Sequence, residues 1–280
     1  MELGIILAFL GTIILGTAKI TAKQAVMQNG QYRGATLIHG SVAATVLLAY
    51  LLFSKEQFSL PQDLSYFFWT ILIGTAAILC LYKAYENGNF SIASAISQSS
   101  FALTAIILVF FFGEHISSRQ IGGMAFVFIG IIALSLIKNK KLYGTFIGTS
   151  WAFGTFVGWG IFLAMIKSLL LQGGPYMSVL WIEGSIFLSV AAFSVIIKQV
   201  KFHLNELRFK PAILTGVQVG IGVLLMYGAF RMISASIATT ILQASVIIPV
   251  IGGRIFFKEQ LSKLQLTAIG VILAGLILLV

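Results

Sequence analysis

Charged residues are scarce in this sequence. Only 9% of the 280 residues are Asp, Glu, Lys or Arg, whereas 59% are hydrophobic, and an ordinary soluble domain carries about 25% charged residues. So few charges cannot cover a water-facing surface of this size, which excludes an ordinary soluble domain. We therefore expect most of the chain to lie in lipid.

Cysteine and aspartate are almost absent, with only Cys80 and Asp63 present. A single cysteine excludes a disulfide framework and a thiolate metal site. The sequence also lacks the motifs of intramembrane hydrolases, namely His-Glu-x-x-His, a Gly-x-Gly-Asp pair and Gly-x-Ser-x-Gly. We therefore expect no enzymatic activity, no cofactor and no metal ion.

Long apolar runs are what the chain does contain. A membrane-spanning helix needs about 20 mainly apolar residues, and ten such runs are separated by short segments with turn or charge signals. The runs fall at about 3–26, 34–53, 64–85, 90–112, 118–137, 143–168, 176–197, 209–231, 234–256 and 262–280. Pro249 lies inside the ninth run and should kink it.

The positive charges are distributed unevenly between the two sides of these runs. The formal net charge is +10, but the basic residues form short clusters between apolar runs and no single stripe, so no nucleic-acid partner is expected. Of the 18 Lys and Arg residues, only Lys55, Arg119, Lys167 and Arg231 lie on the side of the chain termini. The positive-inside rule therefore predicts a cell-membrane protein with both termini outside the cytoplasm.

The second half of the sequence repeats the first. With an offset of 145, residues 84–135 overlay 229–280 with about 15 identities in 52 positions. Polar matches such as Gln98 with Gln243 and Glu114 with Glu259 are harder to obtain by chance than scattered Ile and Ala matches. In the earlier runs the offset is 144, which pairs His39 with Glu183. We call two residues related by these offsets repeat-equivalent.

The repeat predicts the architecture. We expect an all-α integral membrane protein of ten transmembrane helices, arranged as two inverted-topology five-helix repeats around a central cavity. The first repeat covers 1–137, a basic linker covers 138–142, and the second repeat covers 143–280. Five spans are an odd number, so the second half enters the membrane upside down. Many secondary transporters follow this plan and bind substrate between the repeats.

Both halves resemble the EamA repeat of the drug/metabolite transporter superfamily. The first span of each half has a Gly followed seven residues later by Lys, as in Gly16 and Lys23, and the fourth ends in aromatic residues and an acid, as in Phe112-Gly113-Glu114. The resemblance implies a ten-helix basket with a cavity lined mainly by spans 1, 3, 4, 6, 8 and 9. It also implies a transporter of amino acids, amines, nucleosides, drugs or similar small molecules.

The sequence departs from this family at two points. The family often has a proline midway along the fourth span of each repeat; Pro249 fits that pattern, whereas Thr104 takes its place in the first half. Characterised relatives commonly have cytoplasmic termini, and the charge count here predicts the reverse. The direction of transport therefore stays open.

Glu183 and His39 are the sharpest functional candidates. Glu183 lies about seven residues into the seventh run, roughly 10 Å deep at 1.5 Å per residue. An ionisable group at that depth is costly and normally faces a cavity or a partner. We expect one or both to bind a coupling proton, or Glu183 to pair with a substrate amine. The alternative is a structural role in hydrogen bonds between helices.

Further residues are candidates for substrate contact. Gln98 and Gln243 lie in polar patches of the fourth and ninth runs, where they either bond packed helices together or face the cavity. Trp159, Trp181, Tyr82, Tyr85 and Tyr227 could supply aromatic walls, or belong to the interfacial belt and the core. Lys19 either snorkels to the membrane edge or faces the cavity and recognises a carboxylate or phosphate.

Two repeat-equivalent pairs of residues are expected to have structural roles. Glu114 and Glu259 are expected to cap the helices that follow them, near Ser117 and Ser262. Gly130 and Gly275 are expected at close contacts between helices.

The function that these patterns favour is transport of a small organic metabolite by alternating access, with possible coupling to protons. A flippase for a lipid or polyprenyl carrier would use the same fold, but would require a more basic cavity with a lateral opening. A channel is disfavoured because no filter motif or ring of ionisable residues is present. The expected partners are a small-molecule substrate, protons and the lipid bilayer, and the protein is expected as a monomer or homodimer.

Overall fold

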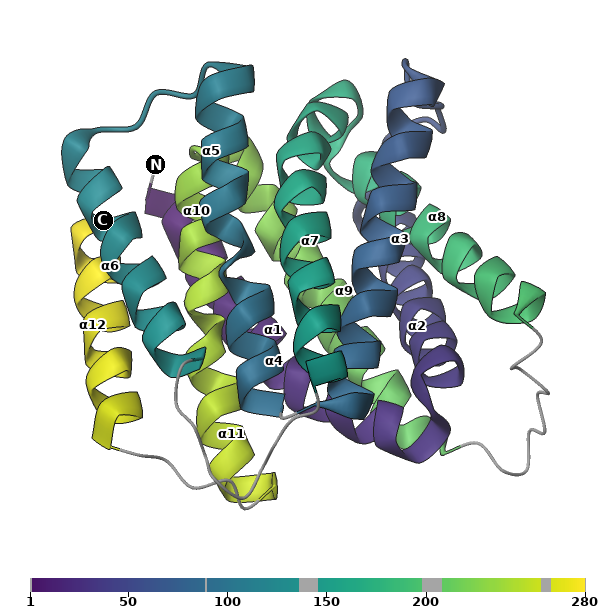
Figure 1. Ribbon diagram of the computed structural model, residues 1–280. Helices are drawn as coiled ribbons and strands as arrows, with labels where there is room; N and C mark the ends of the chain where they lie inside the picture. Colours follow the sequence, from purple (N-terminus) through teal and green to yellow (C-terminus); the bar gives the residue numbers. More distant parts are fainter. Residues whose placement is uncertain (1, 89, 136–145, 198–207, 258–262, 280) are drawn as a thin grey trace.

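The computed structural model describes residues 2–88, 90–135, 146–197, 208–257 and 263–279, and these residues are all-helical in their regular structure (Figure 1). The proposed linker at 138–142, Glu259 and Ser262 lie outside the described residues. The helices of the first half are α1 (Glu2–Asn29), α2 (Gln31–Phe53), α3 (Leu64–Asn87), α4 (Phe90–Gln98), α5 (Ser100–Phe112) and α6 (Ser118–Ser135). Those of the second half are α7 (Phe146–Gln172), α8 (Pro175–Ile196), α9 (Phe209–Met232), α10 (Ala235–Gln243), the 3-10 turn η2 (Ala244–Val246), α11 (Ile247–Phe257) and α12 (Lys263–Leu279).

Eight helical segments of the described chain are long and apolar enough to cross a membrane. Two of them are composite, because α4 continues into α5 and α10 continues through η2 into α11. The runs expected at 118–137 and 262–280 correspond to shorter apolar helices, Ser118–Ala133 and Leu266–Leu279. The structure thus has a helix at every predicted run, and eight of the ten reach the length of a membrane span.

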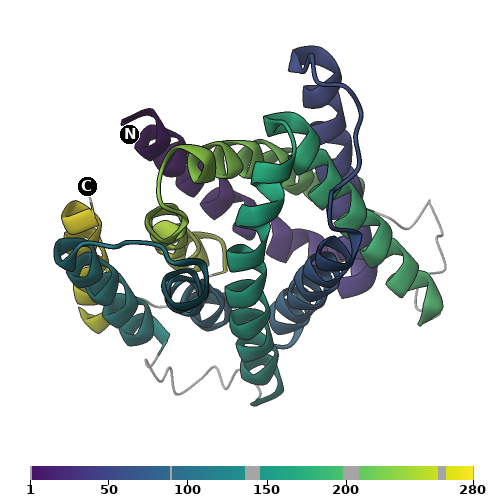
Figure 2. The ribbon, with the colours of Figure 1, turned by 90° about the horizontal axis from the view of Figure 1, so that it is seen from above.

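The two halves pack through exchanged neighbours. The first helix of one half lies against the third helix of the other: α1 packs on α9, and α7 packs on α3. The equivalent helices α2 and α8 pack on each other, as do α6 and α12. Seen from above, α6 and α12 form a pair at one end of the molecule, away from α2 and α8 (Figure 2). The halves therefore share one core and are not separate globular units.

Glycines bring α6 and α12 close together, as the sequence predicts for Gly130 and Gly275. A Cβ atom added at Gly130 would lie 2.9 Å from the carbonyl oxygen of Ala268. Added at Gly275, it would lie 2.7 Å from the carbonyl oxygen of Gly123. Small residues allow this approach, and close packing is a main source of association between helices in lipid.

Both composite helices break at repeat-equivalent positions. At the first break the hydroxyl of Ser99 donates to the carbonyl of Ile96 at 2.6 Å, and such side-chain bonds compete with the helical ladder. At the second, Pro249 has no N–H for the carbonyl of Ser245, four residues earlier, so the ladder is interrupted within η2. The helix is thus interrupted near Pro249, where the sequence predicts a kink. The break at Ser99 is not predicted, because no proline marks it.

Candidate functional site

A cavity of about 150 Å³ lies between the two halves. Its walls come from α1, α2, α3, α4, α7, α8, α9, α10 and η2, so the helices α2 and α8 contribute besides the spans that the family resemblance implies. Eight of the nine predicted site residues line it. They are Lys19, His39, Tyr82, Gln98, Trp159, Glu183, Tyr227 and Gln243.

Two repeat-equivalent pairs join an ionisable side chain to a tyrosine. The hydroxyl of Tyr82 shares a hydrogen bond of 3.3 Å with Nε2 of His39. In the other half, the hydroxyl of Tyr227 donates to Oε1 of Glu183 at 3.1 Å. His39 and Glu183 are 5% and 3% exposed, so each is removed from bulk solvent and opens only onto the cavity. Nδ1 of His39 has no hydrogen-bond partner among the described residues.

A second set of equivalent bonds crosses between the broken helices. Nε2 of Gln98, the last residue of α4, donates to Oγ of Ser245 at 2.7 Å. Nε2 of Gln243, the last residue of α10, donates to Oγ of Ser100 at 3.2 Å. Each glutamine thus binds the break in the opposite half, and the two breaks meet at the cavity. Oε1 of Gln98 is buried and has no partner in the described part of the chain.

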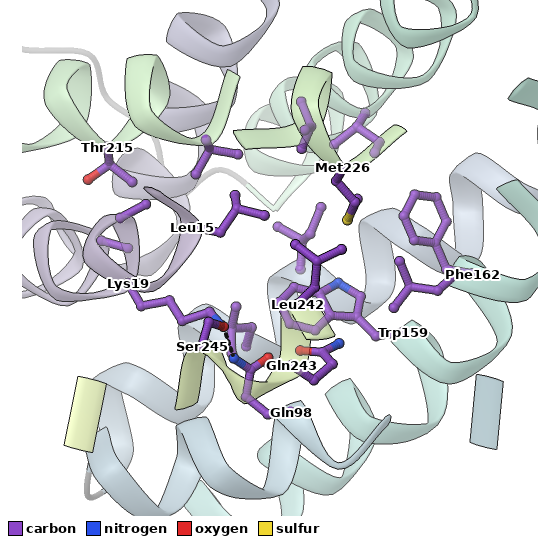
Figure 3. A pocket seen from close by; sticks show the side chains of 18 of the residues that line it. Leu15, Lys19, Gln98, Trp159, Phe162, Thr215, Met226, Leu242, Gln243 and Ser245 are labelled. Carbon is purple, nitrogen blue, oxygen red and sulfur yellow. Dashed lines mark hydrogen bonds between the residues drawn. The ribbon is translucent and has the colours of Figure 1, made fainter. Parts of the chain in front are cut away.

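Lys19 extends from α1 into the cavity, where its Nζ donates to Oγ of Ser245 at 2.8 Å (Figure 3). Of the two alternatives for this residue, the structure therefore selects the cavity over the membrane edge. Trp159, Phe162, Leu242 and Met226 line the same cavity with apolar surface. The result is a largely apolar chamber that holds one amine, one carboxyl and one imidazole.

Comparison with family models gives a match along nearly the whole chain. The model described as "EamA-like transporter family" matches residues 2–136 and again residues 146–280. The chain belongs to the EamA-like transporter family. EamA proteins form part of the drug/metabolite transporter superfamily, so this is a multi-pass membrane protein of a transporter family built from two EamA repeats.

Comparison with solved structures supports the fold of this EamA protein. Twenty-eight chains of solved structures match. One, titled "Crystal structure of protein", superposes with a TM-score of 0.73 at 14% identity and covers 97% of this chain and 94% of its own. At that identity the likeness concerns the fold alone. Comparison with curated proteins finds no match.

Trp181 is the one predicted site residue that does not line the cavity of the EamA protein. It is 7% exposed, and its indole N–H donates to the carbonyl of Ser59 at 2.8 Å. The ring therefore fastens α8 to the segment between α2 and α3. Of the two alternatives for Trp181, the structure therefore favours packing over the cavity wall, because residues 181 and 183 face different sides of a helix with 3.6 residues per turn.

Glu114 does cap a helix, but not the one predicted. Its carboxylate accepts the backbone N–H groups of Ala235 at 2.8 Å and Ser236 at 3.1 Å, at the start of α10 in the other half. It also pairs with Lys167 of α7 at 2.8 Å. The helix α6 after Glu114 is capped instead by Ser117 and Gln120, which bond reciprocally as a capping box.

The environment of Glu114 favours its charged form. Partial burial alone would raise the pKa, but the hydrogen bonds from Lys167 and Ser236 and the charge of Lys167 outweigh burial and hold the pKa of Glu114 below its ordinary value. Glu114 is therefore an anion that joins α5, α7 and α10 at one end of the molecule.

Sequence reasoning anticipated some further polar residues of the cavity of the EamA protein and missed Thr215. Ser245, in the polar patch around Gln243, bonds both Lys19 and Gln98. Tyr85, a candidate for the aromatic wall, also lines the chamber, as does Thr215. The repeat offset pairs Ser245 with Ser100, and both residues follow a glutamine by two positions. Thr215 gives no comparable signal, since one threonine in an apolar helix usually bonds its own backbone, as Thr215 also does.

Proposed function

We propose that this EamA protein is a secondary transporter that carries a small organic metabolite across the cell membrane by alternating access. The single observation behind the proposal is the cavity between the halves, with equivalent polar bonds contributed by each. His39–Tyr82 corresponds to Glu183–Tyr227, and Gln98–Ser245 corresponds to Gln243–Ser100. Equivalent contacts on either side of one chamber suit a carrier, because two packings related by a pseudo-two-fold axis then have similar free energies.

The arrangement of the halves supports ten spans in two inverted repeats. In Figure 1, α1 begins in the upper half of the molecule, whereas α6 ends and α7 begins in the lower half. The repeats are proposed to extend over 1–137 and 143–280. Together with the charge distribution, this arrangement supports the proposal that both termini lie outside the cytoplasm.

The breaks at Ser99 and η2 provide points at which the composite helices can bend. Discontinuous helices at the repeat interface commonly form transporter binding sites. Each break is held to the opposite half by a glutamine bond. Rocking of one half against the other would exchange these bonds, so that the chamber opens to each side in turn.

Proton coupling is assigned to Glu183, with His39 as its repeat-equivalent partner. An ionisable group that is this buried in a membrane protein is costly unless it has a task or a counter-charge. The only hydrogen bond recorded for Glu183 among the described residues comes from Tyr227. The titratable side chains that line the same chamber are Lys19, His39, Tyr82, Tyr85 and Tyr227.

A flippase for a lipid or polyprenyl carrier is the second reading of the fold. The cavity, at about 150 Å³, is below the roughly 300–1,000 Å³ typical of pockets for drug-sized ligands. It also contains a single amine and no cluster of cations in the part of its lining that the structure describes. The size and charge of the cavity therefore favour a small solute over the phosphate group of a lipid or the diphosphate of a polyprenyl carrier.

Solute flux into liposomes tests the proposal. Purified protein is reconstituted, and uptake of radiolabelled amino acids, amines, nucleosides and organic acids is measured with and without a pH gradient. We expect saturable uptake that a pH gradient accelerates. Glu183→Gln should lose the acceleration, whereas Glu86→Gln, at an exposed acid, should retain it.

The possible results separate the alternatives. An undiminished response of Glu183→Gln to the gradient would remove the proton role from Glu183. Scrambling of a fluorescent lipid without uptake of any solute would favour the flippase. Uptake that never saturates would favour a channel.

A further inference from the structure

Lys19 is an amine without a counter-ion in the described structure. The only ion pair among the described residues joins Lys167 to Glu114, so Glu183, although it lines the same cavity, is not within ion-pair distance of Lys19. A lysine ammonium carries three N–H donors, and only one of those of Lys19 has a recorded acceptor, Oγ of Ser245. The amine therefore has donors left for a ligand.

Ser245 presents a further donor at the same place. Its Oγ accepts two hydrogen bonds, from Lys19 at 2.8 Å and from Gln98 at 2.7 Å. With both lone pairs engaged, its hydroxyl hydrogen remains for donation, and no acceptor for it is recorded among the described residues. Figure 3 shows the three side chains converging, with Lys19 entering from α1, Gln98 from α4 and Ser245 from η2.

The remaining polar atom of this cluster is an acceptor. Oε1 of Gln98 is buried and has no partner in the described residues, and the side chain is 1% exposed. Buried polar atoms usually have a partner. A hydroxyl group next to the ligand's carboxylate could supply one.

Glu183 and His39 also line the chamber, but the surface beside this cluster is apolar. Trp159, Phe162 and Met226 line it beside the cluster, together with Leu15 and Leu242. An ammonium in such surroundings is costly unless it is neutralised and hydrogen-bonded. A ligand carboxylate would both neutralise the ammonium and accept its hydrogen bonds, whereas an amide of the same shape is uncharged.

We propose that Lys19 and Ser245, held in place by Gln98, form the subsite for the carboxylate of a small organic acid whose remaining body is apolar. This inference rests on the proposed transport function and specifies its substrate class. Lys19 binds the carboxylate, and Gln98 is a positioning residue that directs the Ser245 hydroxyl toward it. The small volume of the chamber limits the body to one ring or a short branched chain.

Binding is tested separately from transport. The melting temperature of the detergent-purified protein is measured with 3-phenyllactate and 2-hydroxy-4-methylpentanoate, and with the primary amide of each. A ligand raises the melting temperature only by binding the folded state. We expect both acids to stabilise the wild type. Because a hydrogen bond to a charged group contributes about 1.5–3 kcal/mol, each amide should bind about 10- to 150-fold more weakly.

Variants assign the effect to Lys19. Lys19→Met should lose stabilisation by the acids, Lys19→Arg should retain part of it, and Lys55→Met, at an exposed lysine, should behave as the wild type. The melting temperature without ligand shows whether each variant is folded. If Lys19→Met does not fold, Lys19→Arg, which keeps the positive charge, serves as the test variant. Equal stabilisation by acid and amide, or an unchanged acid response in folded Lys19→Met, would overturn the subsite.

Liposome uptake of the same compounds separates the two proposals. Stabilisation by the acids that depends on Lys19, without uptake of any solute, would leave the subsite standing and refute the carrier. Saturable uptake of amines or nucleosides that Lys19→Met does not alter would support the carrier and refute the subsite.

Discussion

At the scale of single residues, Glu114 has the most clearly defined structural role. It accepts two backbone N–H groups at the start of α10 and pairs with Lys167, so its charge stabilises a helix of the opposite half. Anions at a helix N-terminus interact favourably with the helix dipole. The residue thus joins the two halves outside the cavity, at the end where α5 finishes and α10 begins.

We predict that Glu114→Gln lowers the free energy of unfolding at pH 7 by about 1–2 kcal/mol, the usual cost of a lost helix cap. The pKa of Glu114 is lower in the folded than in the unfolded state. The unfolded state therefore binds more protons, and this stabilisation is present above the unfolded pKa of about 4.3 and is lost as pH falls through the folded pKa. Denaturant unfolding of the wild type and Glu114→Gln in mixed micelles between pH 7 and pH 3 measures the difference in their free energies of unfolding.

The control for Glu114 is the exposed Glu86, where Glu86→Gln should leave stability unchanged at every pH. A difference between wild type and Glu114→Gln that stays constant down to pH 3 would contradict the electrostatic origin of the stabilisation.

At the scale of helices, the pair formed by α6 and α12 depends on its glycines. A Cβ added at Gly123 would lie 2.8 Å from the carbonyl oxygen of Gly275, whereas one added at the neighbouring Gly122 would meet no atom within 4 Å. The two positions share a helix and differ only in the face they occupy. They form a matched pair for measuring the contact.

We expect Gly123→Ala to force α6 away from α12 and to destabilise the protein by about 1–3 kcal/mol, the usual cost of overpacking. Gly122→Ala should be neutral or stabilising, because alanine is the better helix former. Thermal unfolding of both variants in the same detergent checks this. Equal melting temperatures would show that the contact between α6 and α12 is not tight in the membrane protein.

At the scale of the whole molecule, the relation between the halves can be mapped directly. In a Cys80→Ser background, single cysteines are introduced as Gln57→Cys, between α2 and α3, and Lys210→Cys, at the start of α9; both positions are exposed. These segments follow the second helix of each half. In an inverted repeat they lie on opposite sides of the membrane.

We predict that a membrane-impermeant maleimide added to intact cells labels the cysteine at 57 and not the one at 210. The positive-inside rule puts the lysine-rich side in the cytoplasm. Labelling of both from one side would rule out the inverted arrangement, and labelling of 210 alone would reverse the orientation. Solubilised protein, in which both cysteines should react, is the control.

The sequence by itself determined the class of protein and its repeated plan. These features can be read directly along the sequence: the few charges, the ten apolar runs and the offset that pairs Gln98 with Gln243. Membrane thickness sets the length of each apolar run, and duplication preserves the spacing between equivalent residues. The offset of 144 in the earlier runs likewise pairs His39 with Glu183. Most of the cavity residues could be predicted because polar groups are costly in lipid and therefore stand out in an apolar sequence.

Only the tertiary structure decided which faces meet. Trp181 and Glu183 are two residues apart, yet one bonds Ser59 and the other lines the cavity. Lys19 faces Ser245 across 226 positions of sequence, and Glu114 caps a helix of the other half. These contacts depend on how α1, α7 and α10 cross one another. The packing of many side chains together sets these crossings, and no local sequence pattern predicts it.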